Sequence, residues 1–280
     1  MIKLGIFGDQ TTSSDLLDQL KTMPGTEVAG VYFSGNASVP AGFVELLSPT
    51  GLMDISDAIL ILSDKTISCE LIRLILRKSK HMYLKTIPNL SIKEIKELID
   101  LEKEAGIVTS IYNPFSYIPS FDPFINKFEK PLLINLRTCF EGNSTKPSHE
   151  MLLLLTAMNR VVQSNYKKLE IFGIRESGVQ INLNLRVEYE NGSVFNLTIS
   201  QEKVPGWCEI FEQSKRTIFN FEPPLSVLYP YLNQEYIAIG NFVRLIQYQD
   251  KKSNSFENLL HGVQIVHEIR EHLRFNEIDF

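Results

Sequence analysis

The first 118 residues alternate short apolar runs with amphipathic stretches, and this alternation is the strongest constraint that the sequence places on the fold. The apolar runs predict buried strands at residues 2–7, 28–33, 58–62, 81–84 and 107–111. Helices are expected between them, and the clearest begins at Ser91, where Glu94 completes a capping box. Strands that alternate with helices at these intervals predict a parallel sheet with helices on both faces.

The pattern changes after the proline-rich passage 113–123. Residues 180–190 alternate polar and apolar side chains, which is typical of a strand with one face in water. Asn191-Gly192 follows, and this dipeptide is favoured in the two-residue turns of β-hairpins. Other strands are expected at 132–140, 169–174 and 193–200, and helices at 149–163 and 256–273.

The predicted fold class is therefore α/β with two domains, a number that the length of 280 residues also favours. Residues 1–118 are expected to form an N-terminal Rossmann-like domain with a parallel sheet. Residues 119–280 are expected to form a C-terminal α+β domain whose sheet is mostly antiparallel. We expect a ligand to bind in a cleft between the two domains.

Charge and cysteine content limit the classes of partner and the cellular compartment. The 28 basic and 33 acidic residues give a net charge of −5 with no basic stripe, so neither a nucleic acid nor an anionic membrane is an expected partner. The three cysteines lie far apart, which is typical of free thiols in a reducing compartment. No apolar run reaches the roughly 20 residues that span a bilayer, and we expect a cytoplasmic protein.

The turn after the first strand is a candidate site for a dinucleotide, because the helix that follows offers unpaired N–H groups to a pyrophosphate. Residues 8–13 align with the G-x-G-x-x-G motif and keep only its first glycine. Asp9 adds a negative charge there, and the second strand ends without the acid that would bind a ribose. The alternative is a Rossmann-like sheet that no longer binds a dinucleotide tightly. The candidate cofactor-binding residues in this region are Gly8, Gln10, Thr11 and Ser34.

Residues 57–65 and 81–107 resemble the glucose–fructose oxidoreductase / inositol dehydrogenase (Gfo/Idh/MocA) family of NAD(P)-dependent enzymes. Leu84-Lys85-Thr86 stands where the family has Glu-Lys-Pro, and Ser63-Asp64-Lys65 stands where it has Thr-Pro-Asn. Further similarity at 112–121, 241–243 and 256–273 extends the resemblance over almost the whole chain. The resemblance implies NAD or NADP as cofactor, a sugar-like small-molecule partner, and a homodimer or higher homo-oligomer.

The resemblance also implies which residues form the site. The family's lysine at the position of Lys85 lies beside the nicotinamide and the reacting hydroxyl, and Ser63 and Lys65 stand in the family's cofactor-binding turn. The family's Asp and His, four residues apart on the first helix of its second domain, have no counterpart in this helix. His149, near the beginning of that helix, is the candidate base in their place, since removing a proton from an alcohol needs a suitable acceptor.

Two functions from different classes remain open. One is an NAD(P)-dependent oxidoreductase that transfers a hydride from a sugar-like or polyol substrate, with Lys85 as the surviving residue of the active site. The other is a non-catalytic relative that serves as a ligand-binding or regulatory protein.

No metal site is predicted, because His261, His267 and His272 fall on different faces of their helix. Trp207, the single tryptophan, is expected to line the cleft or a subunit interface.

Overall fold

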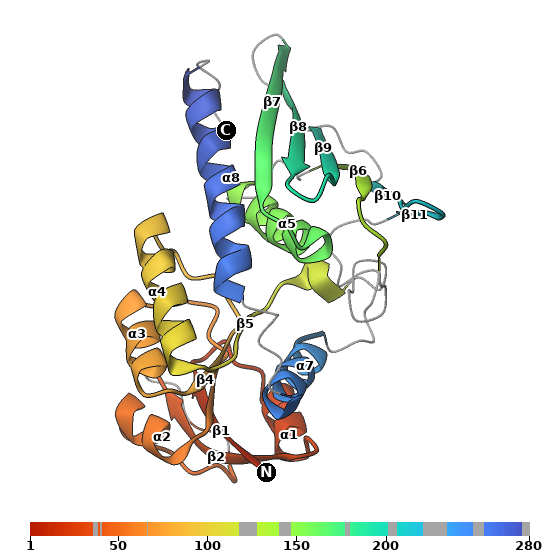
Figure 1. The fold of residues 1–280 in the computed structure, drawn as a ribbon. Helices are drawn as coiled ribbons and strands as arrows, with labels where there is room; N and C mark the ends of the chain where they lie inside the picture. Colours follow the sequence, from red (N-terminus) through yellow and green to blue (C-terminus); the bar gives the residue numbers. More distant parts are fainter. Residues whose placement is uncertain are drawn as a thin grey trace. The chain divides into compact units, whose positions relative to one another are not determined.

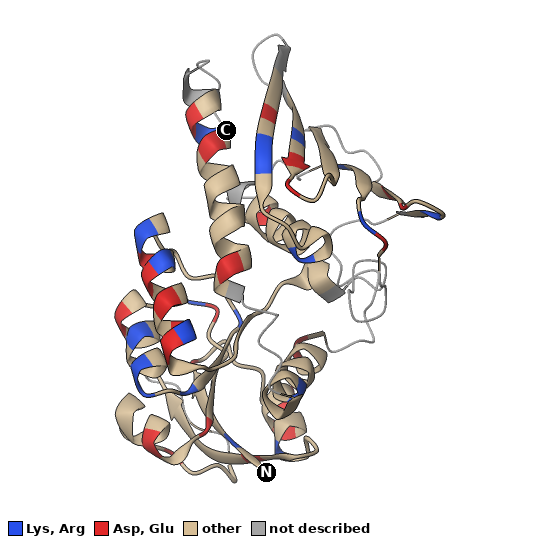
Figure 2. Cartoon of the chain, viewed as in Figure 1, with Lys and Arg blue, Asp and Glu red and all other residues tan. Residues whose placement is uncertain are grey.

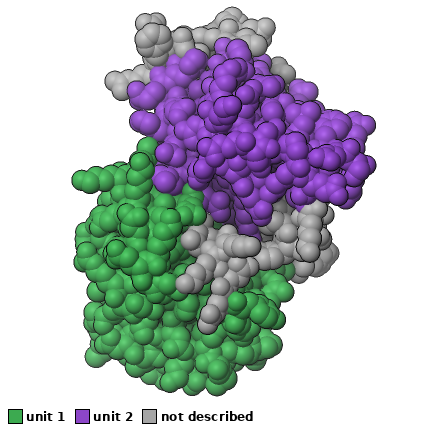
Figure 3. All heavy atoms as spheres, viewed as in Figure 1, with its two compact units in different colours: residues 1–112, 232–257 green, residues 113–231, 258–280 purple. Residues whose placement is uncertain are grey.

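A computed structural model of the protein (Figure 1) describes residues 1–35, 39, 41–65, 67–117, 128–139, 147–176, 180–200, 206–220, 234–248 and 255–275. The end of the proline-rich passage, residues 118–123, lies outside this description. The chain divides into two compact units, residues 1–112 with 232–257 and residues 113–231 with 258–280 (Figure 3).

The first unit contains a five-stranded parallel sheet with the strand order β2-β1-β3-β4-β5. Its strands are β1 (Ile2–Gly8), β2 (Thr26–Phe33), β3 (Ala58–Ile61), β4 (His81–Leu84) and β5 (Thr109–Ile111). Leu4, Ile6 and Leu60 on the central strands are fully buried, as the apolar runs predict. The order reverses at β1, which pairs with β2 on one side and β3 on the other. The carboxyl ends of β1 and β3 therefore form the topological switch point where open α/β sheets bind ligands.

Helices cover both faces of this sheet (Figure 1). On one face lie α2 (Pro49–Ile55), α3 (Cys69–Arg77) and α4 (Ile92–Ala105), and on the other lie α1 (Ser14–Lys21) and α7 (Gln234–Tyr248). Each of the first four helices begins after a serine whose hydroxyl accepts a backbone N–H, which satisfies one orphan donor of the first turn. These caps are Ser13, Ser48, Ser68 and Ser91. The short α2 is not among the helices predicted from the sequence, although Ser48-Pro49 is a typical helix start.

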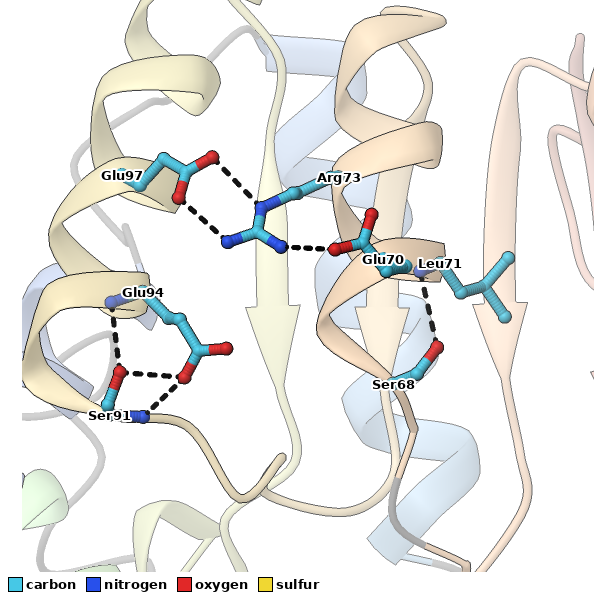
Figure 4. A network of polar contacts seen from close by, with 7 residues as sticks. All are labelled: Ser68, Glu70, Leu71, Arg73, Ser91, Glu94 and Glu97. Atoms are coloured by element: carbon cyan, nitrogen blue, oxygen red, sulfur yellow. Dashed lines mark hydrogen bonds and ion pairs between the residues drawn. The ribbon is translucent and has the colours of Figure 1, made fainter.

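A polar network joins α3 to α4 on the outer surface of the unit (Figure 4). The Arg73 guanidinium donates two hydrogen bonds to the Glu97 carboxylate, of 2.9 and 2.7 Å, and a third of 2.6 Å to Glu70. The capping box at Ser91 and Glu94 is confirmed, with both reciprocal hydrogen bonds present. Figure 2 shows acidic and basic residues mixed along both helices, as expected for a surface in water.

Helix α7 packs against the first unit although it comes late in the sequence. Phe242 of α7 is fully buried, and the centroid of its ring lies 5.9 Å from the centroid of the Tyr83 ring on β4. The sequence pattern predicts a single boundary at residue 118, whereas the structure groups residues 232–257 with the N-terminal sheet. The physical reason is that three of the crossover helices lie on one face, and α7 covers apolar surface of β4 on the opposite face.

The second unit contains a six-stranded sheet with the order β11-β10-β6-β9-β8-β7. Strand β6 pairs with β9 in parallel, and the other described neighbours pair antiparallel. The strands are β6 (Leu133–Cys139), β7 (Tyr166–Glu176), β8 (Gln180–Tyr189), β9 (Val194–Ser200), β10 (Trp207–Phe211) and β11 (Arg216–Asn220). The predicted α/β fold class, with a parallel N-terminal sheet and a mostly antiparallel C-terminal sheet, is confirmed.

Two helices, α5 (Pro147–Val162) and α8 (Ser255–Phe275), contribute to the core of the second unit. A short 3₁₀ turn, η1 (Pro114–Tyr117), packs against α5.

The predicted hairpin turn joins β8 to β9, and Gly192 has a φ of 82°, which an L side chain rarely adopts. Strand side chains such as Phe172 and Ile218 stay 58% and 55% exposed, and Trp207 at the start of β10 is partly exposed. Among the described helices, none is both long and apolar enough to cross a bilayer.

Candidate functional site

The loop after β1 is organised around Asp9, which is only 1% exposed. One Asp9 carboxylate oxygen accepts hydrogen bonds from the Thr11 backbone N–H at 2.8 Å and from the Thr11 hydroxyl at 2.5 Å. The other oxygen accepts a hydrogen bond of 2.6 Å from the hydroxyl of Ser63, which follows β3. The Asp9 N–H in turn donates to the Thr12 hydroxyl at 3.0 Å. Asp9 therefore ties the end of β1 to the end of β3 at the switch point.

The same network uses two of the side chains that the sequence predicts to bind the cofactor. The hydroxyl protons of Thr11 and Ser63 are both donated to Asp9. A side chain at Gly8 would crowd its neighbours, because a Cβ at this position would lie 2.9 Å from ring atoms of Phe33. The Ser34 N–H donates a 3.0 Å hydrogen bond to the Gly8 carbonyl. The structure thus brings Gly8, Thr11, Ser34 and Ser63 together. Gln10 and Lys65 lie in the same two loops with their side chains exposed.

The charge of Asp9 is stabilised inside the protein. Burial raises the pKa of this carboxyl, but hydrogen bonds from Ser63 and Thr11 and the charge of Lys65 outweigh burial, so the pKa lies below its usual value of 3.8. A carboxyl with a depressed pKa in the folded state stabilises the protein above its unfolded-state pKa, and this stabilisation is lost as the pH falls through the folded-state pKa.

We expect Asp9→Asn to lower the free energy of unfolding at pH 7 by about 1–2 kcal/mol, because an amide cannot accept hydrogen bonds on both terminal atoms. The difference from the wild type should shrink as the pH falls below about 3.8, because the unfolded wild-type carboxyl then binds a proton that the folded carboxyl, with its lower pKa, does not yet bind. Urea denaturation at pH 7 and pH 3 measures both values. Asp100→Asn, at an exposed position, is the control and should leave the curve unchanged. Equal losses at both pH values would contradict the charge assignment.

Lys85 lies directly after β4 and is held between two carboxylates. Its Nζ is 3.0 Å from Oδ1 of Asp64, in the loop after β3, and 3.5 Å from Oε2 of Glu235, in the first turn of α7. The side chains of Lys85 and Glu235 are 19% and 17% exposed, whereas that of Asp64 is 55% exposed. The Lys85 N–H donates to the Ile61 carbonyl at 2.9 Å, so the parallel sheet sets the position of the lysine.

Two further hydrogen bonds brace this region. The Thr86 hydroxyl donates to the Ser63 carbonyl at 3.2 Å, which connects the ends of β4 and β3. The Tyr112 hydroxyl donates to the side-chain oxygen of Gln234 at 3.2 Å, which connects the end of β5 to the first turn of α7. The carboxyl edge of the sheet is therefore cross-linked to α7 beside the Lys85 cluster, which we define as Lys85, Asp64 and Glu235.

Burial and the neighbouring charges shift the pKa values of Lys85 and Glu235 in opposite directions. Burial raises the pKa of Glu235, and this effect outweighs the attraction of Lys85. Burial lowers the pKa of Lys85, but Asp64 and Glu235 outweigh it, so the lysine keeps a pKa above its usual 10.5. At neutral pH the cluster therefore holds a firmly protonated amine next to a carboxylate that is more basic than usual.

Lys85 is predicted from the sequence, but the partners that define its environment are not. Asp64 was seen only as part of a turn motif, and Glu235 carries no local signal, since its role depends on α7 returning to the first unit. His149 lies in the first turn of α5, in the second unit. Within the described residues, no group of three or more His, Cys, Asp or Glu side chains could hold a metal ion.

Comparison with known proteins relates the chain by fold. No model of a protein family matches the sequence, and no curated protein matches it. Among solved structures, the fold is similar to UDP-N-acetylglucosamine 3-dehydrogenase from Acidithiobacillus ferrooxidans, with a TM-score of 0.72, 13% identity, and coverage of 96% of this chain and 97% of that one.

Two other solved structures have a fold similar to that of this chain. A dehydrogenase from Chromobacterium violaceum has a TM-score of 0.70 and 13% identity, covering 97% of this chain and 95% of its own. An oxidoreductase from Thermotoga maritima has a TM-score of 0.66 and 17% identity, with coverage of 96% and 95%. At these identities the comparisons show a shared fold over nearly the whole length of each chain.

Proposed function

We propose that the protein is an NAD(P)-dependent oxidoreductase of the Gfo/Idh/MocA type, acting on a hydroxyl of a sugar-like or polyol substrate. The observation that carries the proposal is the position of Lys85, at the carboxyl end of β4, with its ammonium held by two carboxylates. This edge of an open parallel sheet is where ligands bind. The fold that presents the lysine is shared with solved dehydrogenases over nearly its whole length.

The residues at the switch point fit a nicotinamide dinucleotide. Ser13 and Ser14 at the start of α1 are exposed, and a helix N-terminus attracts phosphate. The exposed Lys65 and Gln10 add a cation and an amide in the neighbouring loops. The Asp9 charge is buried and hydrogen-bonded inward, which reduces its repulsion of an anion arriving from solvent. Gly8, Gln10, Ser34 and Lys65 are the residues that would hold the cofactor.

The cofactor, when bound, supplies the hydride acceptor. The protein's own contribution is to orient the substrate, to accept the proton of its hydroxyl and to stabilise the charge that develops on the oxygen. The Lys85 ammonium can donate a hydrogen bond to the substrate oxygen and stabilise the negative charge that develops there as the proton leaves. Its two carboxylate partners restrict the ammonium to one region, which reduces the reorganisation needed during the reaction.

The proposal is tested by titrating the protein with NADH and with NADPH, following nicotinamide fluorescence. We expect micromolar binding of at least one of them, followed by hydride transfer with a member of a sugar and polyol panel. Lys85→Ala should keep binding within a few-fold and reduce turnover by about 10²-fold or more, the usual worth of a positioned proton-transfer group. Lys93→Ala, at an exposed position on α4, is the matched control. Absence of binding up to millimolar concentration would overturn the proposal.

A second candidate function is favoured by the Asp9 network. Because Thr11 and Ser63 donate their hydroxyl protons to Asp9, the loop presents fewer donors to a phosphate than its sequence suggests. A non-catalytic sugar-binding relative is consistent with this arrangement. A thermal shift produced by a sugar or polyol, without any produced by NADH or NADPH, would favour this second function over the first.

A further inference from the structure

The Lys85 cluster contains one cation and two anions. With both carboxylates ionised, it carries one more negative charge than positive charge, so it can take up one proton and become neutral. A group at the carboxyl edge of the sheet that gains a proton without building up net charge is chemically suited to accept the proton of a substrate hydroxyl.

The two carboxylates are not equivalent. Asp64 is more than half exposed, and water solvates its charge. Glu235 is mostly buried, and its Oε1 is shielded from solvent without a hydrogen-bond partner among the described residues, while its Oε2 faces Lys85. A buried carboxylate oxygen without a donor is costly as an anion, and protonation of the carboxyl relieves part of that cost.

We propose that Glu235 is the proton acceptor of the site and acts through Lys85, an inference that rests on the proposed oxidoreductase function. As the substrate O–H bond breaks, its proton forms a new N–H bond on Lys85 Nζ, while an existing Lys85 N–H bond breaks and its proton forms an O–H bond on Glu235 Oε2. The hydride leaves the substrate carbon with its electron pair to the oxidised dinucleotide. The alcohol is oxidised to a carbonyl, the dinucleotide is reduced, and Glu235 ends as a neutral acid.

The surroundings of Glu235 support this direction of transfer. The charged groups that face it are Lys85, after β4, and Asp64, after β3. Burial raises the pKa of Glu235, which brings this carboxyl closer to the pH at which a general base works best. The separation of 3.5 Å between Lys85 Nζ and Glu235 Oε2 is an ion-pair distance, and the flexible lysine stem allows it to close to a hydrogen bond.

The test compares Glu235→Gln, Glu235→Asp and Asp64→Asn in the full chain. With a sugar or polyol that the wild type oxidises, Glu235→Gln should bind NADH within about three-fold of the wild type and lose about 10²-fold or more in turnover. Glu235→Asp keeps an ionisable acceptor and should recover at least ten-fold of that loss. Asp64→Asn should lose less than ten-fold, because the buried acceptor remains.

An infrared pH titration of the protein without cofactor or substrate gives a second readout. The wild type should show a carboxylic-acid band that titrates above the usual range for glutamate and disappears in Glu235→Gln. The band should persist in Asp64→Asn. Glu102 also titrates high, but it is unchanged in Glu235→Gln and cancels in the difference spectrum. A merely structural ion pair would lose stability in the glutamine variant without the rescue by aspartate.

The outcomes separate the two claims. If the wild type binds no dinucleotide, the proposed function fails, and the inference fails with it. If the wild type binds and turns over but Glu235→Gln keeps turnover within three-fold, the proposed function stands and Glu235 is not the acceptor. If Asp64→Asn and Glu235→Gln lose turnover equally and aspartate at 235 restores none, the carboxylates only hold Lys85 in place, and the inference is wrong.

Discussion

Glu102→Gln is expected to stabilise the protein by about 2 kcal/mol at pH 8. Glu102 on α4 is 1% exposed, and burial raises the pKa of its carboxyl from 4.5 to about 7. Such a shift means that the charged carboxylate lowers the stability of the wild type by roughly 3 kcal/mol above pH 7. Glutamine removes this cost but buries amide protons that lack an acceptor, which costs about 1 kcal/mol, so the net gain is about 2 kcal/mol. The Thr109 hydroxyl donates to Glu102 Oε1, an acceptor that glutamine retains.

The sign of the effect follows from the direction of the shift. A carboxyl whose pKa is raised by folding costs nothing below its unfolded-state pKa, and its cost grows as the pH rises between about 4.5 and 7. Urea denaturation at pH 4.5 and pH 8 should therefore show a gain at pH 8 and a loss of up to about 1 kcal/mol at pH 4.5, where the cost of the charge has nearly vanished and the cost of the buried amide protons remains. Glu104→Gln, at an exposed position on α4, is the control. A variant that is destabilised at both pH values would show that the buried carboxylate is satisfied as an anion.

Phe242→Ala is expected to lower the free energy of unfolding by about 3–4 kcal/mol, the usual cost of emptying a buried phenylalanine site. Phe242 is fully buried on α7 and contacts Tyr83 on β4. The loss should appear in the unfolding of the N-terminal sheet, because α7 belongs to that unit although it comes after the second sheet in sequence.

Phe172→Ala provides the matched control for this measurement. Phe172 lies on β7 of the second unit and is 58% exposed, so its removal should change stability by no more than about 0.5 kcal/mol. Denaturation followed by hydrogen exchange would assign each loss to its unit. A small effect of Phe242→Ala would mean that α7 does not complete the core of the first unit.

Local signals in the sequence were sufficient where neighbouring residues decide the structure. The run at residues 81–84 forms β4 with the expected bounds, and the capping box at Ser91 and Glu94 starts α4 as predicted. The Asn191-Gly192 turn joins β8 to β9. The strands β10 and β11 were missed, because these short segments lack the regular polar–apolar alternation seen in β8.

The candidate site was only partly predictable for a related reason. Lys85 could be located because it ends a predicted parallel strand, and such ends gather at one edge of a sheet. The partner Glu235 lies far away in sequence, and its pairing with Lys85 depends on how α7 packs. Asp9 was visible as a charge, but its three hydrogen bonds depend on the neighbouring end of β3.

The sequence by itself determined the order of most strands and helices, the two kinds of sheet, and the presence of a lysine at a ligand-binding edge. These properties arise from periodicity and capping, which act over a few residues. Only the tertiary structure decided that α7 packs with the first sheet, that Glu235 faces Lys85, and that Asp9 is stabilised internally. Those results depend on contacts between distant segments, where burial and charge balance one another in ways that no local pattern encodes.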